Sequence, residues 1–133
     1  MRVQRLVAAG RRAAEALMLD TCRIRPVTGD TTDPDTGQVT PTYGDPVYIG
    51  KCKIQAQKAA LPSNPDAGEH RWAVVPVELH LPVAGTAAVV TGLVAEITAS
   101  GDPANVGRLF RIRSGDRKSL QTAIRCQVEE ITG

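Results

Sequence analysis

The sequence predicts an all-β protein: a small barrel or sandwich of about six strands, with one N-terminal helix and one long loop. Apolar residues alternate with polar ones in several short segments, which is typical of half-buried strands. Glycine, proline, aspartate and asparagine gather between these segments, where turns are expected. A chain of 133 residues is expected to fold as a single domain, residues 1–133, that buries about two thirds of its unfolded surface.

The first predicted element is a helix over residues 3–17, before a barrel over residues 20–131. Its apolar and small residues recur at spacings of three and four and form a narrow stripe. Helices of about 12 to 15 residues are marginal in isolation. We therefore expect this helix either to dock against another protein or to lie as a lid over an open end of the barrel. The candidate interface residues at this end of the chain are Arg2, Arg5, Leu6, Arg11 and Arg12.

The next stretch contains two strands separated by a turn-rich connection. Cys22 and Ile24 fall on one face of the first strand, and Cys52 and Ile54 fall on one face of the second. Between them, Asp33–Gly37 combines a proline, two aspartates and a glycine, which is a strong turn signal. Residues 58–69 have no periodicity and predict a long loop, which is either functional or a disordered connection.

The second half of the chain contains the remaining predicted strands. Pro76 cannot donate a ladder hydrogen bond, so its strand is expected to lie at a sheet edge or to be bulged there. Residues 119–123 are expected to form a short helix or an irregular link. Loops are predicted over residues 83–92 and 101–107. The predicted strands span residues 71–82, 93–99, 109–113 and 124–131.

The cysteines and the charges restrict the class of protein. The three cysteines are odd in number, lack a Cys-x-x-Cys spacing and sit in strand-like runs, so we expect buried free thiols in a reducing compartment. The net charge of +2 is too small to indicate nucleic-acid binding by itself, although arginines concentrate near the N-terminus. No run of apolar residues has the length of a membrane span or a signal sequence, so neither a membrane nor secretion is expected.

The residue pattern does not indicate catalysis or a cofactor. His70 and His80 lie at opposite ends of one predicted strand, too far apart to share a metal without a sharp bend. Glu129 and Glu130 are adjacent and would point to opposite faces of a strand. Nucleotide-binding and nucleophile motifs are absent. A nucleic-acid-binding barrel remains an alternative because arginines occur near the last strands, but few aromatic side chains are available for base stacking.

The stretch 18–55 resembles the opening of the head-to-tail connector proteins of long-tailed phages of actinobacteria, the head-closure or stopper group. The shared pattern is MLDTC-x-I, then DPDTG, then Y-x-G-x-C-x-I-Q. It covers about a third of the chain and consists of strand and turn residues. Matching positions are Met18, Leu19, Asp20, Thr21, Cys22, Ile24, Asp33 to Gly37, Tyr48, Gly50, Cys52, Ile54 and Gln55.

This resemblance implies a structural protein of the virion neck, made in the host cytoplasm. Such stoppers form a ring below the portal and the adaptor, close the DNA channel after packaging and offer a platform for the tail. The implied partners are further copies of the chain, the portal-adaptor ring, the tail terminator and packaged double-stranded DNA held without sequence preference. The helix would contact one neighbouring ring, and the loops 83–92 and 101–107 would contact the other. A tail terminator is an alternative, which a second long helix would favour, but the sequence shows no such helix.

In the stopper group a long loop between early strands projects into the channel as a gate. Residues 58–69 are its counterpart by position, although Lys58 is their only basic residue and Leu61 their only bulky apolar one. Leu61 is a further candidate interface residue, and Lys58 and Arg71 are the candidate channel-facing residues, where they would hold phosphate without reading sequence.

Overall fold

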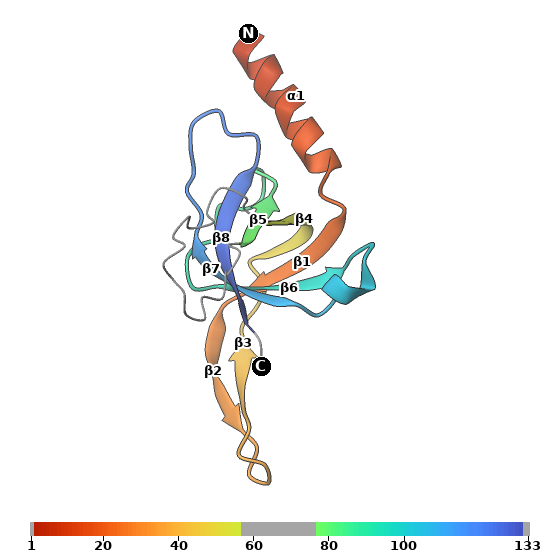
Figure 1. Ribbon diagram of the computed structural model, residues 1–133. Helices are drawn as coiled ribbons and strands as arrows, with labels where there is room; N and C mark the ends of the chain where they lie inside the picture. Colours follow the sequence, from red (N-terminus) through yellow and green to blue (C-terminus); the bar gives the residue numbers. More distant parts are fainter. Residues whose placement is uncertain (1, 57–76, 132–133) are drawn as a thin grey trace, which may run out of the picture.

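The computed structural model describes residues 2–56 and 77–131 and shows one helix followed by strands (Figure 1). The fold is mainly β, and the described helix is N-terminal, as the sequence predicted; a single 3-10 turn, η2, is the other helical element described. The elements are α1 (Arg2–Ala16), β1 (Asp20–Arg25), β2 (Val27–Thr32), β3 (Val39–Tyr43), β4 (Tyr48–Ala56), β5 (Val77–Leu81), β6 (Val94–Ala99), η2 (Pro103–Asn105), β7 (Leu109–Ser114) and β8 (Ile124–Ile131).

Six strands form a closed antiparallel barrel in the order β1-β4-β5-β8-β7-β6. β1 completes the circle, because it pairs with β4 through Thr21 and Lys51 and with β6 through Arg23 and Glu96. Closure gives every barrel strand two hydrogen-bonded neighbours and leaves no open sheet edge. Of the two predicted architectures, the barrel is therefore correct.

The barrel interior follows from the period-2 alternation of its strands. On β1, Cys22 and Ile24 are fully buried, as their pattern predicted, and on β7, Phe110 and Ile112 are fully buried. The intervening side chains point outward and are partly or fully exposed. The same alternation in the other strands builds one contiguous core, which also includes Cys52, Leu79, Leu81, Ala95, Ile97, Ile124 and Cys126.

The three cysteines are buried free thiols within this core. Hydrogen bonding to Cys52 and burial both raise the pKa of the Cys22 thiol. Burial raises the pKa of Cys126 to about 11, although the charge of Arg117 opposes this effect. The thiols act as small apolar side chains, because a thiolate in this interior would lose its hydration.

The structure decides between alternatives that the sequence left open at two places. β5 is not an edge strand in its described part, because Leu79 pairs with Ile54 of β4 on one side and with Cys126 of β8 on the other. Pro76 itself lies outside the described residues. Residues 119–123 form an irregular link and not a short helix.

The connection between β1 and β4 contains two strands that the sequence analysis did not predict. β2 and β3 pair as a separate two-stranded sheet that extends away from the barrel (Figure 1). The predicted turn lies at the tip of this hairpin: the N–H of Asp35 donates to Oδ1 of Asp33 over 2.8 Å, and Gly37 has a φ of 72°. A positive φ favours glycine at this position, so the turn prediction is confirmed.

Truncation of the largest core side chain should destabilise the barrel strongly. We expect Phe110→Ala to lower the free energy of unfolding by about 3–5 kcal/mol, because it removes the side chain and leaves a cavity. Ile49→Ala is the matched control, because the Ile49 side chain lies on the outer wall and is 65% exposed; it should change stability by less than about 0.5 kcal/mol. Urea denaturation of both variants measures the difference, and equal effects would contradict this description of the core.

Candidate functional site

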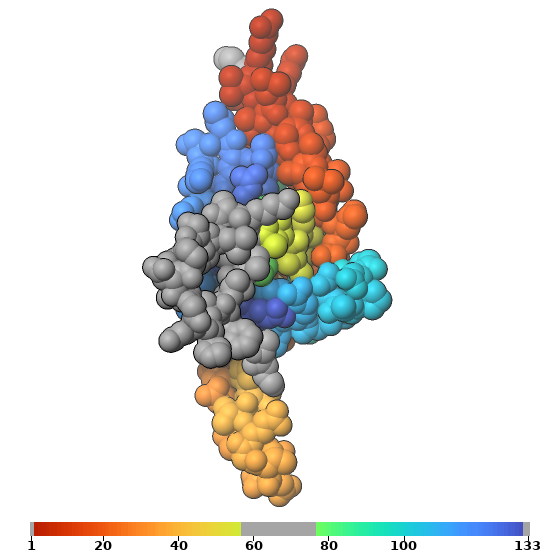
Figure 2. Space-filling view, in the orientation of Figure 1, coloured from red at the N-terminus to blue at the C-terminus, as the bar shows by residue number. Residues whose placement is uncertain are grey.

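Helix α1 projects from one end of the barrel (Figure 1). None of its residues is buried, and the Leu6 side chain is 71% exposed. The helix therefore does not bury an apolar face over the barrel end, as a lid would. Figure 2 shows the same arrangement in space-filling form, with the helix extending beyond the body of the molecule.

The inner face of α1 is attached to the link between β7 and β8. A Cβ atom added at Gly10 would lie 2.7 Å from Cγ2 of Thr122, so glycine permits a close approach of helix and link. Nε of Arg11 donates to the carbonyl oxygen of Gln121 over 3.0 Å. A third contact is the ion pair between Glu15 and Lys51, at 3.6 Å. These contacts fix the direction of the helix without burying it.

The interface candidates on α1 divide into two groups. Arg2, Arg5, Leu6 and Arg12 are exposed. Arg11 is half-buried, because its side chain makes the contact with the β7–β8 link. Arg5 and Arg12 are seven residues apart, nearly two helical turns, so they share the face of the helix opposite Gly10.

The β2–β3 hairpin projects from the opposite end of the molecule (Figures 1 and 2). All residues of β2 are exposed, and within β3 only Tyr43 is partly buried. At the base of the hairpin, the guanidinium of Arg25 lies 4.1 Å above the ring of Tyr43. Arg25 also shares the carboxylate of Glu96 with Arg23. The base is therefore held to the barrel wall, and residues 38–41 of the hairpin face residues 106–109 and 130–131 across an open cavity of about 520 Å³.

Sequence reasoning missed this hairpin because its strands carry threonines and aspartates without a buried face. The signal that indicates it is the pair of Thr- and Val-containing segments on either side of the Asp33–Gly37 turn. The hairpin contains Asp30, Asp33 and Asp35, and residues 27–43 contain no lysine or arginine.

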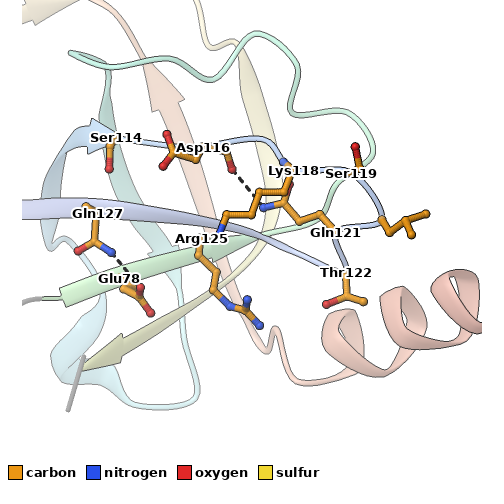
Figure 3. A pocket seen from close by; sticks show the side chains of 10 residues that line it. Glu78, Ser114, Asp116, Lys118, Ser119, Gln121, Thr122, Arg125 and Gln127 are labelled. Atoms are coloured by element: carbon orange, nitrogen blue, oxygen red, sulfur yellow. Dashed lines mark hydrogen bonds between the residues drawn. The ribbon is translucent and has the colours of Figure 1, made fainter. Parts of the chain in front are cut away.

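A polar cavity of about 500 Å³ lies between the 114–122 segment and the outer faces of β5 and β8 (Figure 3). The residues that line it form hydrogen bonds with one another. Nε2 of Gln127 donates to Oε2 of Glu78 over 2.9 Å, and Nε2 of Gln121 donates to the backbone carbonyl oxygen of Asp116. Within residues 2–56 and 77–131, no serine or threonine of this lining is hydrogen-bonded to a histidine or a carboxylate. The cavity therefore shows no pairing of a nucleophile with a base.

The described residues contain no cluster of three or more side chains that could hold a metal ion. Nε2 of His80 lies 3.2 Å from Oε1 of Glu78, and His70 lies outside the described residues. Among the residues that the structure describes, no helix is long and apolar enough to cross a membrane.

The remaining candidates differ in how the structure places them. Lys58, Leu61 and Arg71, with the predicted loop 58–69, lie outside the described residues. The predicted loop 83–92 is held in place by Thr86, whose hydroxyl donates to the carbonyl oxygen of Pro82 over 2.7 Å. The loop 101–107 includes η2, which Asp102 caps.

Gly10 is the position whose substitution tests the attachment of α1. We expect Gly10→Leu to separate the helix from Thr122, because the larger side chain cannot fit between them. A detached helix of this length should fray and exchange its amide hydrogens faster. Ala9→Leu is the matched control, because Ala9 is exposed and its side chain has space. Hydrogen exchange of the α1 amides measures the effect, and equal protection in both variants would contradict it.

Comparisons with known proteins give a family and one similar fold. No curated protein matches the chain. A structural match is the solution structure of protein SF1141 from Shigella flexneri 2a, with a TM-score of 0.51 and 14% sequence identity, covering 84% of this chain and 90% of that one. At this identity the match concerns the fold alone. The family of unknown function DUF6093 matches residues 10–129, so the chain belongs to this family.

Proposed function

We propose that this protein is a structural component of the phage neck, a head-to-tail stopper. In this role, copies of the chain form a ring that closes the DNA channel below the portal and the adaptor. The same ring provides the platform to which the tail attaches. The action is steric and electrostatic, and it needs neither catalysis nor a cofactor.

The observation that carries the proposal is the presence of two projecting elements at opposite ends of a closed barrel (Figure 1). Neither α1 nor the β2–β3 hairpin has a fully buried side chain. Isolated helices and two-stranded hairpins are marginal, so both elements would gain stability from a partner. A ring subunit needs such surfaces to join other copies of the chain and to meet the neighbouring rings. The sequence resemblance to the stopper group supports the same role independently.

The proposal assigns partners to α1, to two loops and to two basic residues. The apolar side chains at the N-terminal end of α1, Val3 and Leu6, are exposed and would contact the portal-adaptor ring. The loops 83–92 and 101–107 would contact the tail terminator. Packaged DNA would meet Lys58 and Arg71, which would hold phosphate through charge alone. The protein would be made in the host cytoplasm and would function in the virion.

The alternative functions have less support. A tail terminator was expected to carry a second long helix, and within residues 2–56 and 77–131 the only helices are α1 and the three-residue η2. A nucleic-acid-binding barrel was expected to present aromatic side chains for base stacking. Phe110 is fully buried in the core, and the guanidinium of Arg25 covers one face of the Tyr43 ring.

Recruitment by the portal-adaptor ring tests the proposal directly. We expect light scattering to show several copies of the chain bound to one purified adaptor ring. Leu6→Asp should weaken this recruitment about tenfold or more, because it places a charge in an apolar contact. Val106→Asp is the matched control: Val106 is 49% exposed and lies in the 101–107 loop, which the proposal assigns to the tail side. It should leave adaptor recruitment unchanged.

A chain that does not bind the adaptor ring would refute the stopper proposal. Binding of single-stranded DNA across a salt series would then test the nucleic-acid alternative, whose affinity should fall steeply as salt rises.

Retention of packaged DNA tests the channel assignment. We expect the double variant Lys58→Ala, Arg71→Ala to assemble normally but to lose packaged DNA faster, because two phosphate contacts per subunit are removed. Nuclease protection of DNA in assembled particles measures retention. Unchanged retention in assembled particles would refute the luminal position of these residues.

A further inference from the structure

The charges of the two projecting elements are opposite in sign. Helix α1 carries four arginines and one glutamate, a net charge of +3. The hairpin segment 27–43 carries three aspartates and no basic residue, a net charge of −3. The whole chain has a net charge of only +2. Figure 1 places the two elements at opposite ends of the barrel, so the charge is separated along the molecule.

The basic residues of α1 that face solvent lie on one side. Arg2, Arg5 and Arg12 are exposed, and their spacing places them within about a quarter turn of one another. Arg5 and Arg12 lie about 10 Å apart along the helix axis at a rise of 1.5 Å per residue. Neither makes a hydrogen bond or an ion pair within the described chain, whereas Arg11 points toward the link and donates to Gln121.

The acidic residues of the hairpin occupy its outer half. Asp30 lies in β2, and Asp33 and Asp35 lie at the tip; all three are exposed. Hydrogen bonds from the turn, above all from the N–H of Asp35, hold the pKa of Asp33 below its usual value. The hairpin tip therefore keeps its negative charge at neutral pH.

The hairpin is not suited to accept an added strand at its edges. The register of β2 and β3 shifts between Val27 and Gly29, Pro41 lacks an N–H, and the aspartates repel a closely placed chain with the same charges. Bulges, prolines and charges protect edge strands from pairing. Contacts of this hairpin should therefore be made by its carboxylates.

We propose that the acidic tip of the β2–β3 hairpin binds the arginine face of α1 in a second copy of the chain. Arg5 and Arg12 would donate charge-assisted hydrogen bonds to the carboxylates of Asp30 and Asp35. The contact deepens the proposed stopper function and rests on it, because it names the surfaces by which copies join.

A second copy is the occupant that the observations favour. The chain supplies both halves of a complementary pair, equal in charge and opposite in sign, on elements that cannot reach each other within one molecule. The 15-residue helix is about 22 Å long, and strands of five or six residues span about 17–20 Å, so the two projecting elements are similar in length. A heterologous contact between opposite ends repeats from copy to copy and generates a ring when the rotation closes.

A charge exchange on the full-length chain tests the contact. One variant carries Arg5→Glu and Arg12→Glu, and it spares Arg11, which attaches the helix. Another carries Asp30→Lys and Asp35→Lys, and it spares Asp33, whose carboxylate accepts from the turn. A third carries all four substitutions. Sedimentation velocity at about 20 mM salt and protein concentrations up to about 1 mM measures self-association, where charges are weakly screened.

We expect the wild-type chain to self-associate and to lose this association as salt rises to about 200 mM. Each double variant should associate at least about tenfold more weakly, because two attractive pairs become repulsive. An equimolar mixture of the two double variants should regain association, because the arginine helix of one variant meets the aspartate hairpin of the other, and the glutamate helix meets the lysine hairpin at the reciprocal contact. The variant with all four substitutions should regain association close to that of the wild type. Circular dichroism should show that all variants fold.

The contact is refuted if the wild type stays monomeric under these conditions or if folded double variants associate as the wild type does. The contact is also refuted if the variant with all four substitutions folds but fails to regain association. Titration with duplex DNA tests whether nucleic acid occupies the helix face instead. If the Arg5→Glu, Arg12→Glu variant loses DNA binding but self-associates as the wild type does, the helix face binds nucleic acid. Failure of adaptor recruitment would refute the stopper function, whereas failure of low-salt association refutes only this contact.

Discussion

Closure of the six-stranded barrel is the constraint on which the rest of the structure depends. β1 pairs with β4 and with β6, so each barrel strand has a hydrogen-bonded neighbour on both sides. Closure also directs alternate side chains such as Ile24 and Phe110 into one shared core. Because no strand edge remains, the barrel offers other molecules its outer side chains but no backbone to pair with. Elements that project from the barrel add contact surfaces to these outer side chains.

Within residues 2–56 and 77–131, α1 and the β2–β3 hairpin are two such elements, and both are attached by a few contacts near the barrel. The approach of Gly10 to Thr122 and the hydrogen bond of Arg11 fix helix α1. Stacking of Arg25 on Tyr43 and a backbone hydrogen bond from Gly44 to Pro26 fix the base of the hairpin. Each element is thus oriented by its inner side, while its outer side has no partner within the described chain. Such elements are preorganised for association, because little ordering remains to be done on contact.

The proposed role in the phage neck fits this division between a rigid body and projecting ends. A barrel with buried thiols and a dense apolar core supplies the body, and the ends differ in charge, so they do not present the same surface to a partner. Unlike ends favour heterologous contacts, which build rings, over isologous contacts, which build dimers. The charge separation would also orient copies before they touch, because electrostatic attraction acts over about a Debye length.

The sequence by itself determined the fold class, the N-terminal helix, the burial pattern of the barrel strands and the turn at Asp33–Gly37, because these depend on local periodicity and turn chemistry. It also named Arg2, Arg5, Leu6 and Arg12, which are exposed on the helix, as interface candidates. Only the tertiary structure decided that the strands close into a barrel, that β5 is internal and that Arg11 faces inward. The hairpin strands escaped prediction because they have no buried face and therefore no apolar alternation. The opposite placement of basic helix and acidic hairpin was equally hidden, since separation in space follows from strand order and not from distance along the chain.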